Sequence, residues 1–361
     1  MHLKLKLFLS ALLFTCTCNA VLAEEQMVFA VDVIRHGDRA PIEAIPNAPW
    51  TENLPLGHLS PVGMQQEFHL GEQFRERYIS KYHLLPERYS PETMYVRSSD
   101  IDRTLMSAEC VLLGLYPVGT GPSVGGESAL PSSYQPIPIH TRPRNEDSLL
   151  VMDFNPKLSS TIAQYVHTTK EWKQKVDNLQ PKFKRWNQLT GGKIDTLRGV
   201  GGLGDALNIY KLHNVSIPKG LSDADAREIV DETEWIFAAC FKPHEIGDLT
   251  SHELLKVIHD YFQSATEEKS KLRYVLFSAH DTTIAGMMSI LRDPVDRRPP
   301  YSSDLNLALF KDGAQYKVRI TFNGKPVEAP GFKNGEGTIK DLEAILEPKT
   351  NLSSNVLEIS K

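Results

Sequence analysis

One pattern occurs three times in this sequence and constrains how the chain can fold. A short apolar run is followed by charged residues, and a segment with helical periodicity comes next. The apolar runs cover residues 27–34, 93–96 and 272–277, and apolar helix-like segments follow the last two at 104–115 and 282–291. Units that pass from strand to helix in this way predict a largely parallel sheet covered by helices on both faces. We therefore expect an α/β fold.

The charged residues after the three apolar runs are the first indication of function. They read RHGDRAP at 35–41, RSSDIDR at 97–103 and SAHD at 278–281. In an open α/β sheet, ligands bind beyond the carboxyl ends of the strands. Because parallel strands end at the same edge, we expect all three charged segments to meet there.

The remainder of the chain predicts a second, smaller unit. Residues 117–143 are rich in Pro, Gly and Ser and indicate a long irregular connection, whereas most patterns that follow are helical. We expect an α/β core formed by residues 24–150 and 265–361, and a mainly helical insertion formed by residues 151–264.

Two further local signals concern the core. Residues 59–78 predict a helix, with Ser60 as the N-cap and Pro61 in the first turn. Towards the C-terminus, alternating apolar residues surround the turns Asp312-Gly313 and Asn323-Gly324, which predicts an antiparallel hairpin at the edge of the sheet.

The first 23 residues have the features of a signal peptide. Lys4 and Lys6 precede an apolar stretch that ends in Val21-Leu22-Ala23. The alternative is a membrane anchor, which needs about 20 apolar residues. We expect cleavage after Ala23 and an exported protein, periplasmic or secreted, without a stable membrane anchor, because no later segment is apolar enough to span a bilayer.

Charge and cysteine content exclude some functions. The formal net charge is −5, and removal of residues 1–23 takes away two lysines, leaving −7. This acidic balance argues against a nucleic-acid partner. Cys110 and Cys240 remain after cleavage. They form either one disulfide or two buried thiols, and they are too few for a zinc site of the CxxC…CxxC kind.

Several common motifs are absent or misleading. Residues 199–204 match GxGxxG, but no strand pattern precedes them and no second strand follows, as a dinucleotide site requires. We expect a glycine-rich turn before a helix capped by Asp205. The chain has no GxxxxGK[ST] and no GxSxG, and residues 252–259 are not HExxH. These patterns do not favour an NTPase, a serine hydrolase or a zinc protease.

Taken together, the three charged segments predict an anion site. Its candidate residues are Arg35, His36, Arg39, Arg103, His280 and Asp281. Three guanidiniums with two imidazoles suit a small dianion, and phosphate best, because the planar arginine fork matches phosphate oxygens in pairs. Each residue also has an ordinary structural interpretation. Arg103 could pair with Asp100 or Asp102, and Asp281 could only cap a helix.

These segments resemble the histidine acid phosphatases, branch 2 of the histidine phosphatase superfamily, of the prostatic and lysosomal type. RHGDRAP fits the RHGxRxP signature of that family at every position, residues 95–108 resemble its second arginine segment, and 280–283 resemble its His-Asp motif. The resemblance runs from about residue 27 to beyond residue 310. It implies a phosphoglycerate-mutase-like α/β fold. Relatives are often dimers, so a homodimer is an expectation too.

The resemblance also implies roles for the matched residues. His36 would be the nucleophile that becomes phosphohistidine, and Asp281 would give a proton to the leaving group. The phosphate oxygens would be held by Arg35, Arg39, Arg103 and His280. No metal or other cofactor is implied. Arg97 matches the pattern only by adjacency and is left out of this set.

Elementary electrostatics agrees with those roles. An arginine ~6 Å from an imidazole disfavours the imidazolium by roughly 3 kcal/mol at an effective dielectric constant of ~20, which lowers the pKa by about 2 units. The arginines that bind phosphate can therefore keep His36 neutral and nucleophilic in acid. The same cations should lower the pKa of Asp281.

The sequence thus predicts an exported acid phosphatase that acts on small phosphate monoesters. A phytase or sugar phosphatase of the same family is the main alternative, although phytases have HDTN where this chain has Thr283. Two other classes are a metal-dependent hydrolase that uses Asp38 beside His36, His280 and Asp281, and a phosphate-binding protein without catalysis.

Overall fold

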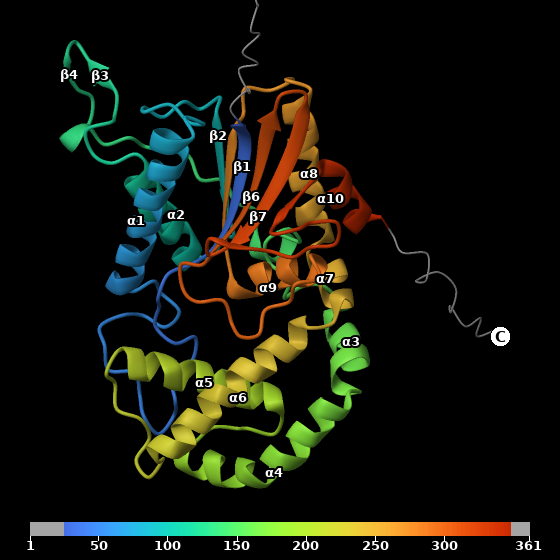
Figure 1. Ribbon diagram of the computed structural model, residues 1–361. Coiled ribbons are helices and arrows are strands. Elements are labelled where there is room, and N and C mark those ends of the chain that lie inside the picture. Colours follow the sequence, from blue (N-terminus) through green and yellow to red (C-terminus); the bar gives the residue numbers. More distant parts are fainter. Residues whose placement is uncertain (1–24, 348–361) are drawn as a thin grey trace, which may run out of the picture.

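The computed structural model describes residues 25–347, which form one large sheet with helices on both faces and a helical unit at one end (Figure 1). The sheet has seven strands in the order β2-β5-β1-β6-β7-β8, with β9 also paired to β7. Their bounds are β1 Gln26–Arg35, β2 Met94–Ser98, β5 Tyr274–Ala279, β6 Asp304–Asp312, β7 Gln315–Phe322, β8 Lys325–Pro326 and β9 Glu336–Gly337. The short strands β3 Ser123–Val124 and β4 Glu127–Ser128 form a separate hairpin.

The helices surround this sheet and continue beyond its lower end in Figure 1. Their bounds are α1 Pro61–Arg75, α2 Asp102–Leu115, α3 Leu158–Ile162, α4 Lys170–Thr190, α5 Leu197–Leu212, α6 Asp223–Phe241, α7 His244–Thr250, α8 His252–Thr266, α9 Asp281–Ile290 and α10 Ile339–Leu346. The helix expected at 59–78 is α1, and the side chain of Ser60 accepts a hydrogen bond from the backbone of Gly63 at its N-terminus.

The three strands that the sequence predicted are adjacent and parallel. β5 pairs in parallel with β1 on one side and with β2 on the other, so their carboxyl ends share one edge. The predicted hairpin is β6–β7, which pairs antiparallel with β1 and extends the sheet. The α/β fold class is confirmed, with the parallel strands in one half and the hairpin in the other.

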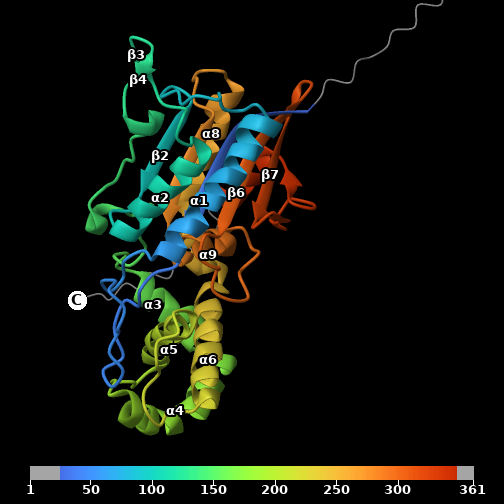
Figure 2. The ribbon, with the colours of Figure 1, turned by 90° about the vertical axis from the view of Figure 1, so that its left-hand side faces the viewer.

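Alternation along β1 explains why both faces carry helices. Phe29, Val31 and Val33 lie in one apolar cluster with residues of α8, α9 and α10. Ala30 and Ile34 lie in another cluster with residues of α1 and α2. Each fully buried aliphatic or aromatic side chain contributes about 1.5–3 kcal/mol. A central strand with two apolar faces is therefore stable only between two helical layers, and Figure 2 shows α1 and α2 in front of the sheet.

The helical unit has a core of its own. α4, α5 and α6 bury a shared cluster that includes Trp172, Trp186, Leu207, Tyr210 and Ile229, together with Ile45 and Ala48 from the loop after β1. In Figures 1 and 2 this unit lies beyond the carboxyl ends of β1, β2 and β5. It therefore faces the edge where the charged segments end.

One helix inside the expected insertion range packs elsewhere. All but the last two residues of α8 fall within the range 151–264, yet Leu254, Leu255, Ile258 and Phe262 pack into the cluster beside the sheet. By its contacts, α8 is part of the α/β core. The helices that share the separate core end with α6.

The glycine-rich segment 199–204 was expected to be a turn, and that expectation was wrong. It lies inside α5, whose N-cap is Thr196, so Asp205 is not a cap. A Cβ atom on Gly204 would lie 1.9 Å from the hydroxyl oxygen of Thr233 on α6. Close contact between α5 and α6 therefore requires glycine here, and packing overrides its poor helix propensity.

The structure favours two free thiols over a disulfide between the two cysteines. Cys110 lies on α2 and Cys240 on α6, and they form no disulfide with each other. Burial raises the pKa of each thiol to about 11. The predicted signal peptide, residues 1–23, lies outside the described residues. Within residues 25–347, no helix is long and apolar enough to cross a membrane.

Candidate active site

The carboxyl ends of the three parallel strands carry the charged residues of the candidate site. Arg35 is the last residue of β1 and His36 follows it, while His280 and Asp281 follow β5 and begin α9. Arg103 lies in the first turn of α2, after β2. The rings of His36 and His280 meet edge to face, with centroids 5.7 Å apart. Segments that are far apart in sequence therefore converge at one edge.

Close backbone packing holds the loop that carries His36. A Cβ on Gly37 would lie 2.4 Å from the carbonyl oxygen of Gly63 in α1, so this position accepts only glycine without rearrangement. The backbone N–H of Gly37 also donates to Ser107 of α2. These contacts with α1 and α2 fix the direction in which His36 leaves the strand.

His36 has the protonation state and the orientation of a nucleophile. Its Nδ1 lies 2.8 Å from the carbonyl oxygen of Gly37, and a carbonyl only accepts, so Nδ1 carries the proton. The lone pair is then on Nε2. Burial holds the pKa of His36 well below its usual value, and Arg35 and Arg103 lower it further. A buried imidazole is thus kept neutral by the cations around it.

His280 is neutral for the same reasons. Burial lowers its pKa to about 3, and the charge of Arg103 adds to the effect. Its Nε2 lies 2.9 Å from the hydroxyl oxygen of Ser99, which follows β2. The contact fixes the ring of His280 relative to the neighbouring strand.

Arg103 is the site arginine without a counter-ion. Between residues 25 and 347, no carboxylate forms an ion pair with it, and Asp102 pairs instead with His58 at 3.3 Å. Burial lowers the pKa of Arg103 to about 10, and repulsion by Arg39 contributes. The structure does not support the alternative that Arg103 is neutralised by its acidic neighbours. A partly desolvated cation of this kind favours an anionic ligand.

Arg35 and Arg39 are paired with carboxylates. Arg35 lies 3.2 Å from Asp281, and its guanidinium carbon is 4.1 Å from the ring centroid of Tyr301. Arg39 makes two contacts of 3.1 Å with the carboxylate of Asp205 on α5. An incoming phosphate would therefore compete with Asp281 for Arg35 and with Asp205 for Arg39.

Asp281 is held as a carboxylate. Its Oδ2 lies 3.2 Å from Arg35 and 3.1 Å from Arg298, and its Oδ1 accepts the backbone N–H of Thr282. Burial acts to raise the pKa of Asp281, but Arg35 and Arg298 hold it well below its usual range. Asp281 is the first residue of α9, with His280 at the N-cap position, so it is more than a cap.

Comparison with known proteins gives this arrangement a family. The chain is 32% identical to lysosomal acid phosphatase of Xenopus laevis over 95% of its own length and 82% of that protein. It is 30% identical to human prostatic acid phosphatase over 88% of its own length and 83% of that protein. This chain belongs to the histidine phosphatase superfamily, branch 2.

The family model for histidine phosphatases of branch 2 matches residues 26–200 directly. Solved structures agree on the fold. A phytase from Citrobacter braakii superposes with a TM-score of 0.65 at 16% identity, covering 89% of this chain and 97% of that one. A phytase from Klebsiella gives 0.64 at 17% identity, covering 90% and 95%. The family, and with it the enzyme class that the sequence predicted, are confirmed.

Other charged residues near this histidine phosphatase site have separate partners. Arg97 pairs with buried Asp147, in line with its omission from the predicted set. Asp38 accepts a hydrogen bond from Ser60 and lies 2.7 Å from Nε2 of His213. The carboxylate that a metal-dependent alternative would need is thus already engaged. Among the described residues, no group of three His, Cys, Asp or Glu side chains could hold a metal ion.

Sequence reasoning missed three residues that contact the histidine phosphatase site: Asp205, Arg298 and Tyr301. Asp205 was considered only as a helix cap. Arg298 and Tyr301 flank Pro299-Pro300 in the loop after α9 and belong to none of the three charged segments. No spacing rule identifies these residues. Asp205 reaches the site from α5 of the helical unit, and Arg298 and Tyr301 reach it because of how the loop after α9 folds.

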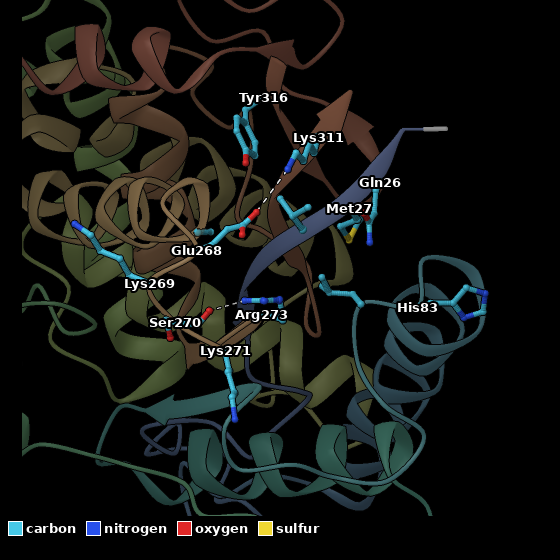
Figure 3. A pocket seen from close by; sticks show the side chains of 13 residues that line it. Gln26, Met27, His83, Glu268, Lys269, Ser270, Lys271, Arg273, Lys311 and Tyr316 are labelled. Atoms are coloured by element: carbon cyan, nitrogen blue, oxygen red, sulfur yellow. Dashed lines mark hydrogen bonds and ion pairs between the residues drawn. The ribbon is translucent and has the colours of Figure 1, made fainter. Parts of the chain in front are cut away.

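A separate cavity lies away from the site. It has a volume of about 450 Å³ and is bordered by the start of β1 at Gln26 and Met27 and by residues 268–273 before β5 (Figure 3). Two of its cations are paired, Lys271 with Glu92 and Lys311 with Glu268. Because β1 begins at this cavity and ends at Arg35, the cavity lies at the opposite edge of the sheet from His36.

Proposed function

We propose that this histidine phosphatase is an acid phosphatase that hydrolyses phosphate monoesters through a phosphohistidine at His36. The observation that carries the proposal is a buried neutral imidazole, His36, near enough to Arg103 for that charge to lower its pKa, while Arg103 forms no ion pair with a carboxylate among residues 25–347. A phosphoryl group fits this arrangement, because its oxygens can pair with the guanidinium while the imidazole attacks its phosphorus. Phosphoryl transfer depends mainly on positioning and on stabilising charge at the phosphate oxygens.

Binding comes first in the proposed sequence. Arg103 meets the phosphate without losing a partner, whereas Arg35 and Arg39 exchange Asp281 and Asp205 for phosphate oxygens. His280, oriented by Ser99, completes the set. Guanidinium forks bind such oxygens in pairs and stay charged at working pH.

Chemistry follows in two steps. Nε2 of His36 attacks phosphorus, a P–N bond forms, and the P–O bond to the leaving group breaks while Asp281 gives that oxygen a proton. Water then attacks the phosphohistidine, the P–N bond breaks, and the carboxylate of Asp281 accepts the proton that water loses. The net reaction consumes one water and releases an alcohol and inorganic phosphate.

The proton on Asp281 explains an acid optimum. In the free enzyme Asp281 is ionised, because two guanidiniums hold its pKa low. A phosphate monoester loses its second proton near pH ~6, so in acid the substrate is a monoanion. When Arg35 turns from Asp281 to the phosphate, the substrate proton can move to Asp281. Activity should therefore fall as pH rises above the pKa at which the enzyme–substrate complex loses the proton shared by the substrate and Asp281.

Relatives and side chains favour a general acid phosphatase over a phytase. The two sequence relatives above are named acid phosphatases, whereas the phytase structures are under 25% identical and show the fold alone. Thr283 donates its hydroxyl to the carbonyl of Leu150, so it fastens α9 to the preceding loop. In addition, the extra guanidinium Arg298 is paired with carboxylates rather than open to a second phosphate.

The remaining parts of the proposal rest on sequence and family. Export follows from residues 1–23 and agrees with a relative named lysosomal. Metal independence follows from the family resemblance, and a homodimer stays a prediction.

One substrate panel tests the function. Initial rates with an aryl phosphate, an alkyl phosphate and inositol hexakisphosphate are measured between pH 4 and pH 8, with and without EDTA. We expect both monoesters to be hydrolysed fastest in acid, in EDTA, and only when His36 is present. Preference for inositol hexakisphosphate would favour a phytase, and loss of rate in EDTA would refute metal independence. Equal phosphate release by His36→Ala would refute the proposal itself.

A further inference from the structure

Arg298, in the loop after α9, contacts residues of α9, α5 and α6. Its Nη1 lies 3.1 Å from Oδ2 of Asp281 and 3.3 Å from Oδ1 of Asp205 on α5. Its backbone N–H donates to Glu234 of α6 at 2.9 Å, and its guanidinium carbon lies 4.8 Å from the ring centroid of Phe237 on the same helix. A single side chain therefore joins the loop after α9, the helical unit and the proposed proton donor.

Through Arg298 the site charges form a continuous alternating series. It runs from Arg35 to Asp281, Arg298, Asp205 and Arg39, with neighbouring partners 3.1–3.3 Å apart. Both ends are arginines that we assign to phosphate binding, and the middle member belongs to no matched motif. The side chains of Asp281, Arg298 and Asp205 are 12%, 19% and 16% exposed, so water screens these pairs only partly.

The geometry at Asp281 shows when this contact matters. Oδ1 accepts the N–H of Thr282, and Oδ2 accepts a hydrogen bond from Arg298 and forms an ion pair with Arg35. Once Arg35 turns to the phosphate, Arg298 is the remaining guanidinium on Oδ2. The position of the donor oxygen during proton transfer then depends on Arg298.

We propose that Arg298 is a positioning residue of the catalytic centre, which holds Asp281 beside the leaving group and ties it to the helical unit through Asp205. The proposal rests on the function proposed above. It predicts two separable effects of removing Arg298, one on the geometry of proton transfer and one on the pH at which Asp281 carries a proton.

The pH effect has a definite sign. The charged and titratable groups that face Asp281 are Arg35 at the end of β1, His36 and Arg39 after it, Arg103 on α2, the adjacent His280, and Arg298 from the loop after α9. Those that face Arg298 are Asp281, Asp205, Glu234, Arg39 and Arg35. Loss of Arg298 removes one cation from Asp281, so the carboxylate binds a proton more readily. A donor that must be protonated then stays active to higher pH.

The test compares Arg298→Met and Arg298→Gln with the wild type on an alkyl and an aryl phosphate. Because an alkoxide needs the proton more than a phenolate does, kcat on the alkyl ester should fall about tenfold or more at the optimum, and kcat on the aryl ester should fall less. The alkaline limb of kcat should move up by about one pH unit or more. KM should change less than kcat, since Arg298 is paired with Asp205 and Asp281 and is not among the residues that we assign to phosphate binding. The glutamine side chain can still form a hydrogen bond with Asp205. Arg298→Gln therefore keeps the test valid if Arg298→Met fails to fold.

Arg292→Met is the matched control. Arg292 also follows α9, is similarly buried, and makes two contacts with the carboxylate of Asp248 at 2.8 and 3.2 Å, away from the site. It should keep the wild-type pH profile and leaving-group dependence. Arg298→Lys retains the charge and should keep the wild-type alkaline limb while losing part of the rate.

Two outcomes are distinguished. If the wild type hydrolyses both esters and folded Arg298→Met and Arg298→Gln have its pH profile and leaving-group dependence, Arg298 has no positioning role. A wild type that releases phosphate from neither ester refutes the proposed function instead.

Discussion

Substitution of Arg103 should lower activity and raise stability, and both effects can be worked from the structure. Arg103 has no carboxylate partner in the described chain, so its guanidinium is free to meet phosphate. Each hydrogen bond to a charged group contributes about 1.5 kcal/mol or more. Loss of a two-bond contact in Arg103→Met therefore costs about 3 kcal/mol, or roughly 150-fold in kcat/KM.

The stability of the same variant should move in the opposite direction. The pKa of Arg103 falls well below its usual value, to about 10, because the site is buried and other cations are near. Below both values the residue is charged whether folded or unfolded, so the shift measures how much folding disfavours this charge. It amounts to roughly 3 kcal/mol as an upper bound. Methionine removes that charge, and the free energy of unfolding should rise by about 1–3 kcal/mol.

The assay combines kinetics with urea unfolding in phosphate-free buffer, because bound phosphate would stabilise the wild type selectively. Arg292→Met serves again as the control. It removes a paired cation, so it should lower stability by about 1 kcal/mol and leave kcat/KM unchanged. If Arg103→Met lost less than about tenfold in kcat/KM and was also destabilised, Arg103 would be an ordinary structural arginine.

Three further predictions follow from single contacts. Gly37→Ala places a Cβ 2.4 Å from the Gly63 carbonyl oxygen and should lower the free energy of unfolding by about 2 kcal/mol or more. In Gly201→Ala the added Cβ meets no atom within 4 Å, so this control should raise the free energy of unfolding by about 0.5–1 kcal/mol. Equal effects of the two substitutions in urea unfolding would refute the packing argument. Asp281→Asn should reduce kcat on an alkyl phosphate by about 10²–10⁴ and on an aryl phosphate by much less; an unchanged alkyl rate would exclude Asp281 as the donor. The imidazole of His280, with its pKa lowered to about 3, should stay neutral from pH 7 to pH 4 in an NMR titration without phosphate; a midpoint near 6.5 would contradict the burial argument.

The part of the fold that sequence predicted is the part governed by local pattern. An apolar run followed by charged residues predicted β1, β2 and β5. Because these strands pair in parallel, His36, Arg103 and His280 lie at the same edge of the sheet. Turn residues located the β6–β7 hairpin for the same reason. These signals lie in contiguous residues, and the common edge follows from the direction of the strands.

What sequence missed depends on contacts between distant segments. Residues 199–204 are helical because α5 packs closely on α6, and α8 joins the sheet because of the face it buries. Asp205 and Arg298 reach the site from the helical unit and from the loop after α9. Local propensity carries no information about such partners.

The most direct test of the central claim is detection of the covalent intermediate. The enzyme is mixed with an aryl phosphate and quenched in base, in which a phosphoramidate survives, and the modified peptide is identified by mass spectrometry. Asp281→Asn should increase the signal, because the same carboxylate activates water in the second step. The account predicts phosphate on His36 alone and none in His36→Ala. Turnover without an adduct in either enzyme, or an adduct on another residue, would contradict it.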